Sequence, residues 1–267
     1  MRLPPVTHGL AWLGAALLWV PLLAVAVFSV NAARHGLAWE GFTLEWYRRL
    51  LQDQLVLEAT RNTLLVAVVS TAIATTLGTA LALALERFPW PPRLLRLWEG
   101  LIDLPVVTPD IVIAAALVIA FWCLRSFSDR FQPGLLTMTI AHATFQLSFV
   151  ALVVRGRLQL IGPTLSEAAR DLYASNALLF FRVTLPLLLP GILAGALLAF
   201  TLSLDDFVIS FLTCGNKNTL PIYIYSQAKR GLTPEAHALS TLIVVGTALL
   251  ALGLWRTSRA LRPEELA

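Results

Sequence analysis

Three acidic residues stand where charged side chains are scarce, and they are the first candidates for chemistry in this sequence. Asp110 follows Pro109 at the start of an apolar run, and Asp205 and Asp206 come directly after another such run. Carboxylates can replace the water around a cation, which is otherwise costly to move through a medium of low polarity. Each has a structural alternative: Asp110 can cap the start of a helix, and the Asp205–Asp206 pair can mark a helix that ends in water.

Asp205 and Asp206 cannot both face one pathway if they belong to one helix, because successive helical residues point about 100° apart. We therefore expect one of them to serve a cation, while the other caps a helix, pairs with an arginine or contacts an external protein. Tyr223 and Tyr225 follow in a predicted loop and could supply cation–π contacts. Their alternation favours ordinary loop packing instead.

The sequence argues against several other kinds of site. His142 lies inside an apolar run with no His or Cys at metal-ligand spacing, so we expect a structural polar residue that a neighbouring helix satisfies. Cys123 and Cys214 are far apart and form no CxxC motif, which favours a packing role. The sequence contains no G-x-x-x-x-G-K-[ST], the motif of a nucleotide-binding P-loop. We expect no catalytic residue, metal ligand or cofactor in this chain.

The composition indicates a membrane protein. Of the 267 residues, 57% are hydrophobic and 13% are charged, whereas a soluble domain carries about 25% charged residues. The basic residues are mostly arginines spread singly along the chain, and this pattern does not favour nucleic-acid binding, which needs a clustered basic face.

Six stretches meet or approach the length needed to cross a bilayer, about 20 helical residues for a core of about 30 Å. They are Leu10–Val30, Asn62–Leu85, Leu104–Leu124, Phe131–Val154, Val183–Leu204 and Ala238–Trp255. The third reaches full length only by taking Asp110 into the membrane. The first is too long for a signal peptide and reads as a retained helix. An even number of spans puts both termini on one side, and 11 Lys and Arg residues on that side against nine on the other favour cytoplasmic termini.

The connection from Arg155 to Arg182 is unusually polar and long for a membrane protein of this size. Ser166 can cap a helix that opens with Glu167, whose charge suits the positive end of the helix dipole. An apolar stripe then follows at helical spacing, made of Leu165, Ala168, Ala169 and Leu172. We expect this short helix to enter a groove on another protein; the alternative is a helix lying on lipid headgroups.

This segment resembles the EAA loop of ABC-importer permeases. The family pattern is EAA, three residues, Gly, nine residues, Ile or Val, one residue, Leu-Pro, and it is matched by Glu167-Ala168-Ala169, Asp171-Leu172 and Val183-Thr184-Leu185-Pro186. The pattern's glycine falls on Tyr173 here. Glycine would relieve backbone strain between two short helices, so Tyr173 puts the geometry of that turn in question.

Four further segments are similar to one branch of this family, the spermidine and putrescine importers. They are LPVVTPDIVIAAAL (104–117), LAFTLSLDDFVISFLTCG (198–215), TLPIYIYS (219–226) and GLTPEAHALSTL (231–242). The resemblance covers most of the chain and is weakest before Asn62. It implies an all-α permease of the type I ABC-importer fold with six transmembrane helices, which moves polyamines across a bacterial inner membrane by alternating access.

The resemblance also implies partners and residue roles. A second homologous permease would complete the pathway, a dimer of cytoplasmic ATPases would bind ATP and Mg, and a periplasmic protein would deliver the polyamine. ATPase coupling is assigned to Glu167, Ala168, Ala169, Asp171, Leu172 and Tyr173, and the substrate pathway to Asp110, Asp205 and Asp206. Pro186 and Pro190 each remove a helical hydrogen bond and can kink the helix that follows, although Pro186 could simply begin the span.

The expected organisation has three parts. Residues 1–61 form the first transmembrane helix and a periplasmic loop, residues 62–255 form the permease core with a coupling segment at 155–182, and residues 256–267 form a cytoplasmic tail. Two alternatives remain: an ABC permease for another cationic or small organic solute, and a proton-coupled secondary transporter with Asp110 as the proton carrier. An intramembrane enzyme is disfavoured, because Asp110 and His142 are too few for a catalytic set.

Overall fold

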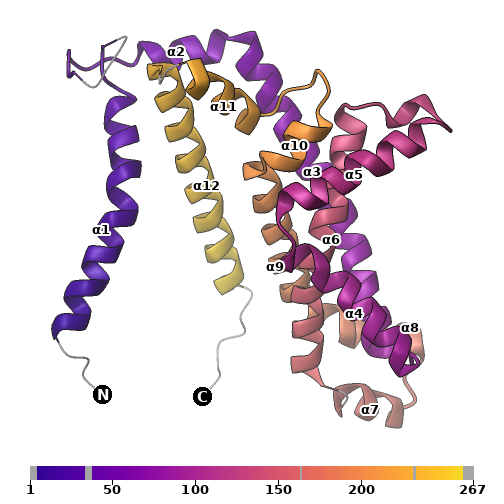
Figure 1. The fold of residues 1–267 in the computed structure, drawn as a ribbon. Helices are drawn as coiled ribbons and strands as arrows, with labels where there is room; N and C mark the ends of the chain where they lie inside the picture. Colours follow the sequence, from indigo (N-terminus) through magenta and orange to yellow (C-terminus); the bar gives the residue numbers. More distant parts are fainter. Residues whose placement is uncertain (1–4, 34–37, 163, 231–232, 261–267) are drawn as a thin grey trace. The chain divides into compact units, whose positions relative to one another are not determined.

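The computed structural model describes residues 5–33, 38–162, 164–230 and 233–260, and these residues are mostly helical, as predicted (Figure 1). The extended pairing found among them is an isolated bridge between Asn31 and Phe42. The chain divides into two compact units. Unit 1 contains residues 1–58 and 223–267, and unit 2 contains residues 59–222.

Unit 1 is built on helices α1 (Pro5–Phe28), α2 (Glu45–Gln52) and α12 (Pro234–Ala260), together with most of α11 (Leu220–Arg230). The start of α1 and the end of α12 lie at the same end of this unit (Figure 1). The Trp46 indole donates to the carbonyl of Asn31 at 2.7 Å and fixes the connection between α1 and α2. Of the expected tail at 256–267, the part up to Ala260 continues α12, and residues 261–267 lie outside the described residues.

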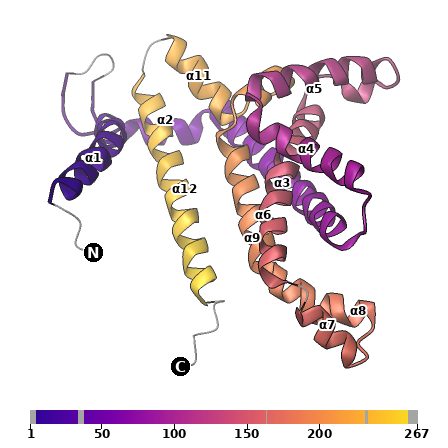
Figure 2. The ribbon, with the colours of Figure 1, turned by 60° about the horizontal axis from the view of Figure 1, so that its bottom comes forward.

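Unit 2 is centred on α3 (Gln54–Arg87), α6 (Leu135–Ile161) and α9 (Leu185–Asp205), and Figure 2 shows α6 and α9 side by side. Small residues allow these helices to approach closely, as is usual where lipid removes the hydrophobic driving force between helices. A Cβ atom added to Gly78 would lie 2.9 Å from the carbonyl oxygen of Leu147, and one added to Gly195 would lie 3.3 Å from Val150. Close packing therefore holds the centre of unit 2 together.

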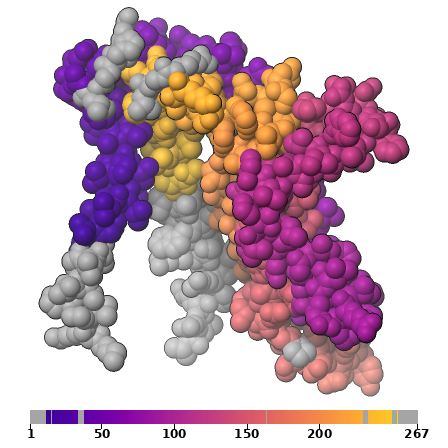
Figure 3. Space-filling model, viewed as in Figure 1, coloured from indigo at the N-terminus to yellow at the C-terminus, as the bar shows by residue number. Residues whose placement is uncertain are grey.

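The span expected at Leu104–Leu124 is interrupted by a sharp bend. The chain forms two helices there, α4 (Pro92–Val107) and α5 (Asp110–Arg125), which are bent by 115° relative to each other. The break follows from Pro109, which has no N–H to donate and pushes the preceding Thr108 into an extended conformation, with φ −89° and ψ 135°. Both helices can be seen on the face of unit 2 shown in Figure 3, and both have exposed large apolar side chains.

Within the described residues, three helical stretches are long and apolar enough to cross a membrane: Gln54–Arg87, Leu135–Ile161 and Asn176–Asp205. The bent pair α4–α5 would make a fourth if it counts as a single span, and Trp12–Phe28 is a shorter apolar helix. These helices bear out the membrane class, while the count of six spans stays a prediction.

The helix after the polar connection begins earlier than its hydropathy predicts. It starts within the connection as α8 (Asn176–Leu179), continues through a π-helical turn, η2 (Phe180–Thr184), and becomes α9 without interruption. Its 30 residues correspond to a rod of about 45 Å at 1.5 Å per residue. One helix thus runs from the polar connection to Asp205.

The close approach at Gly78 gives a first testable prediction. Gly78→Ala should lower the thermal midpoint of the purified protein in detergent, because the added methyl group overpacks the α3–α6 contact, which typically costs about 1–3 kcal/mol. Gly156→Ala in α6 is the matched control, since a Cβ atom there meets nothing within 4 Å. Equal thermal midpoints for the two variants would contradict the packing described here.

Candidate functional site

Asp205 and Asp206 lie at a break in the chain between α9 and α10 (Val208–Thr213). Asp206 directly follows the last residue of α9 in an extended conformation, with φ −64° and ψ 120°, and its carboxylate points toward α10. The carboxylate accepts hydrogen bonds from the backbone N–H groups of Ile209 at 3.3 Å and Ser210 at 2.8 Å. These N–H groups belong to the first turn of α10, where a negative side chain satisfies donors that have no helical partner.

His142 of α6 completes a buried polar cluster around Asp206. Its Nε2 lies 3.3 Å from the Asp206 carboxylate and 2.9 Å from the Ser210 hydroxyl, and its Nδ1 lies 2.7 Å from the Ser203 hydroxyl. His142 is 2% exposed and the Asp206 side chain 9% exposed. As expected, neighbouring helices satisfy His142, and its contacts join α6, α9 and α10.

Asp205 has a different environment from Asp206. It is exposed, and so is Asp110, the first residue of α5. Ile113, one turn after Asp110, and Ile209, in the first turn of α10, belong to one buried apolar cluster, which places the start of α5 near the α9–α10 break. Neither forms an ion pair with another residue in the described part of the chain. The fold thus leaves two of the three candidate carboxylates exposed, on segments of unit 2 that pack against each other, and turns the third inward.

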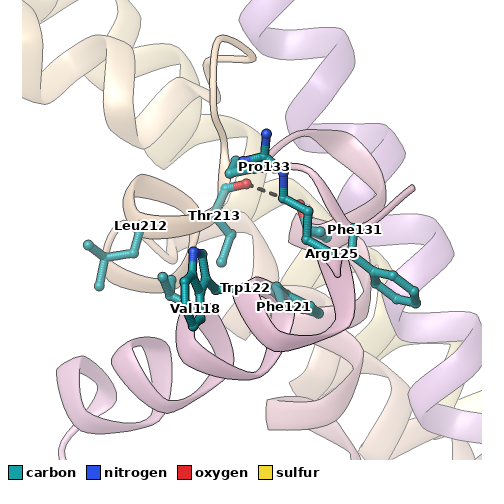
Figure 4. Close-up of a pocket in the computed structure, with 9 residues that line it drawn as sticks. Val118, Phe121, Trp122, Arg125, Phe131, Pro133, Leu212 and Thr213 are labelled. Carbon is teal, nitrogen blue, oxygen red and sulfur yellow. Dashed lines mark hydrogen bonds between the residues drawn. The ribbon is translucent and has the colours of Figure 1, made fainter. Parts of the chain in front are cut away.

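A cavity beside α5 and α10 differs from the surroundings of the carboxylates, because most of its lining is apolar (Figure 4). Its lining is mainly apolar and includes Phe121, Trp122 and Phe131, with Arg125 as its charged member. An arginine in an apolar setting disfavours a second positive charge. This cavity therefore does not suit a cationic solute, and the carboxylates remain the better candidates.

The coupling segment forms a short helix, α7 (Thr164–Asp171). The expectation that Ser166 caps this helix is wrong: the helix begins two residues earlier, and Ser166 is buried inside its first turn, where its hydroxyl accepts a hydrogen bond from Arg87 at 3.1 Å. Among the residues assigned to coupling, Ala169 is partly buried. The others are exposed: Glu167, Ala168, Asp171, Leu172 and Tyr173. The side chains of Leu172 and Tyr173 are 82% and 97% exposed.

Tyr173 adopts the backbone conformation that the family pattern assigns to glycine. Its φ is +59°, in the left-handed region, which costs a non-glycine residue about 1–2 kcal/mol. Its N–H donates to the carbonyl of Arg170 at 2.8 Å, and the next residue, Ala174, donates to Ala169 at 3.0 Å. The turn therefore ends α7 with a tyrosine in place of the glycine.

A polar cluster that the sequence analysis missed lies near α7. Arg155 of α6 forms ion pairs with Glu86 of α3 and Glu99 of α4, both at 2.6 Å, and Gln159 donates to Glu86 at 2.8 Å. In the sequence, these charged residues are visible at the ends of apolar runs, but no local pattern indicates which of them form ion pairs with one another. The cluster fixes α3, α4 and α6 to one another where α7 begins.

Pro186 and Pro190 follow the π-helical turn. The N–H of Leu185 donates to the carbonyl of Phe180, five residues earlier, directly before Pro186, which has no N–H to donate. Prolines and π turns are common causes of bends in long helices. The kink assigned to these two prolines stays a prediction. At Gly191 the stem of Arg157 packs directly against the helix, and Arg157 donates to the Leu187 carbonyl at 3.2 Å.

The chain is similar to solved transporter structures. Over 97% of this chain and 96% of the other, the fold matches a bacterial ABC transporter involved in import of the acidic polysaccharide alginate, with a TM-score of 0.75 and 16% identity. It also matches the MetNI methionine ABC transporter over 78% of this chain and 97% of the other, with a TM-score of 0.67 and 19% identity. At these identities the likeness concerns the fold.

Sequence comparison gives stronger relationships. The putrescine transport system permease protein PotI of Escherichia coli (strain K12) is 36% identical over 91% of this chain and 87% of its own length. The spermidine/putrescine transport system permease protein PotC of the same strain is 36% identical over 86% of this chain and 85% of its own length. Residues 74–261 match the model of the family described as binding-protein-dependent transport system inner membrane component. The chain belongs to this family of transport permeases.

Proposed function

We propose that this chain is the permease subunit of an ABC importer that moves polyamines across a bacterial inner membrane. The observation that carries the proposal is the 36% identity with a putrescine permease over 91% of the chain. Family membership supports transport, and the exposed carboxylates of Asp110 and Asp205 suit a cationic solute.

The proposed assembly follows the general arrangement of ABC importers. A solved alginate transporter to which the chain is similar was captured with a periplasmic protein bound to an alginate pentasaccharide. By analogy, this chain would pair with a second permease, two cytoplasmic ATPases that bind ATP and Mg, and a periplasmic polyamine-binding protein. It would cross the membrane six times with both termini in the cytoplasm. ATP hydrolysis belongs to the partners, because the sequence has no P-loop.

The carboxylate pair would receive the cation. Two negative charges that lie close together repel each other, and a bound cation relieves this repulsion. A polyamine carries several positive charges along a flexible chain, so it can contact both Asp110 and Asp205 without needing a rigid pocket. Asp206 takes no part in this contact, because its carboxylate is committed to His142 and to the first turn of α10.

Coupling would use the continuous helix from Asn176 to Asp205 as a lever. ATP binding closes the ATPases and displaces α7, and the helix that begins five residues after Asp171 carries the displacement toward Asp205. A flexible linker would dissipate this motion. The hydrogen bond from Arg87 to Ser166 links α7 to α3, so the displacement also reaches the rest of unit 2.

ATP hydrolysis by the complete transporter tests the proposal directly. When this chain is reconstituted in lipid with its ATPase, partner permease and binding protein, spermidine or putrescine should stimulate hydrolysis, and only when the binding protein is present. ATP hydrolysis that polyamines do not stimulate would refute the proposed solute. The assignment as an ABC permease would then stand, and another solute would be favoured. Uptake driven by a proton gradient without ATP would favour a secondary transporter.

Charge reversal on α7 tests the coupling role. Glu167→Arg should abolish uptake and weaken association with the ATPase, because Glu167 is exposed on the helix proposed to dock there. Association is measured by copurification from membranes, and insertion by the amount of chain in the membrane fraction. Glu45→Arg, at an exposed position of α2 in unit 1, is the control. Normal uptake by the Glu167 variant would overturn the coupling assignment.

Neutralising one carboxylate tests the pathway. Asp205→Asn should raise the KM for polyamine uptake about tenfold, which corresponds to about 1.4 kcal/mol of lost binding. Asp110→Asn should act in the same direction. Asp129→Asn is the matched control, because Asp129 is an exposed aspartate in the short helix η1 (Asp129–Phe131). A KM unchanged in both test variants would exclude these carboxylates from the pathway.

A further inference from the structure

We propose that His142 is a positioning residue for the carboxylate pair: it holds Asp206 inward at the α9–α10 break and thereby keeps Asp205 beside Asp110. In the described part of the chain, its ring makes polar contacts with Ser203, Ser210 and Asp206 and not with Asp205. The effect of His142 on Asp205 therefore passes through the adjacent residue. The transport readout of this inference rests on the proposed function, whereas its structural readout does not.

Because the Asp206 carboxylate is buried, its position depends on the hydrogen-bond donors around it. A carboxylate removed from water is costly unless hydrogen bonds replace its hydration. Asp206 is held by two backbone N–H groups, from Ile209 and Ser210, and lies 3.3 Å from His142 Nε2. If the imidazole is removed, the carboxylate keeps the backbone donors but loses its partner on α6. It then gains by turning toward water.

The backbone transmits this change to Asp205. Asp205 is the last residue of α9, and Asp206 leaves the helix with ψ 120°. Because adjacent residues point about 100° apart in a helix and to opposite sides in extended chain, a backbone rotation that turns Asp206 toward water redirects Asp205 as well. The inward Asp206 and the outward Asp205 are thus two results of a single backbone geometry.

The histidine is suited to this task because its two ring nitrogens point in different directions. Nδ1 reaches Ser203 of α9 at 2.7 Å, and Nε2 reaches Ser210 of α10 at 2.9 Å. The ring therefore bridges the two sides of the break from a third helix. Ser203 is also 3.4 Å from Ser70 of α3, which extends the same polar contact across the centre of unit 2.

Cross-linking in the assembled transporter measures the positioning without depending on cargo. Asp110→Cys and Asp205→Cys are introduced together, and exposed Cys123 is removed as Cys123→Ser. Buried Cys214 stays, because burial raises the pKa of its thiol and keeps it unreactive. A short bifunctional thiol reagent should link the two introduced thiols, as detected by mass spectrometry of the joined peptides.

Substitution of His142 should then change the cross-linking rate. His142→Leu should lower it at least fivefold, and His142→Gln, which keeps a donor and an acceptor, should restore part of it. Thr144→Ala is the control on the same helix, since the Thr144 hydroxyl is exposed and bonds to its own helix at Ile140. An unchanged rate in His142→Leu would overturn the proposal. If that variant does not fold, Ser203→Ala with Ser210→Ala removes the two hydroxyl contacts of the ring and leaves its contact with Asp206, so it should lower the rate in the same direction but by less.

Transport separates this inference from the proposed function. In the chain with its natural aspartates, His142→Leu should raise the KM for polyamine about as much as Asp205→Asn does, while maximal ATP hydrolysis stays within twofold of normal. Loss of cross-linking together with an unchanged KM in Asp205→Asn would leave the positioning role standing and remove the carboxylates from the pathway. Loss of ATP hydrolysis with normal cross-linking would overturn the positioning role, because His142 would then act elsewhere.

Discussion

The buried carboxylate of Asp206 is the constraint on which the arrangement of the candidate pathway depends. An anion that is 9% exposed must be surrounded by donors, and here α10 supplies two N–H groups while His142 supplies a partner from α6. Satisfying it requires α9 to end, the chain to turn and α10 to begin, all within a few residues. That turn leaves Asp205 exposed, as Asp110 is at the start of the neighbouring helix α5.

The two ends of α9 are therefore held by different kinds of contact. At the end near Asp205, a buried cluster fixes the helix break. At the other end, Arg157 of α6 donates to the Leu187 carbonyl at 3.2 Å and packs against Gly191. Between these ends the helices meet through small residues such as Gly195. A helix that is fixed by contacts at both ends and closely packed in the middle can transmit a displacement along its length. Coupling to an ATPase requires such transmission.

The backbone conformation that favours glycine is present at the glycine position of the family pattern, even though the residue there is different. Tyr173 stands at the glycine position of the pattern, yet its φ of +59° is the one that favours glycine. The surrounding hydrogen bonds between Ala174 and Ala169, and between Tyr173 and Arg170, stabilise the turn. Its side chain is 97% exposed, so the tyrosine adds contact area to the surface where a partner is proposed to dock.

The sequence by itself determined the helical class, the membrane character, the polar connection and the three acidic candidates, because hydropathy and motif spacing are local properties. The helix break before Asp110 was also locally encoded, in Thr108-Pro109, but hydropathy averaged over it. Only the tertiary structure decided which aspartate turns inward, which helices satisfy His142 and which charges meet Arg155. These outcomes depend on residues such as Glu86 and Ser203 that approach from other helices, and pairing across such sequence distances leaves no periodic signal in a single chain.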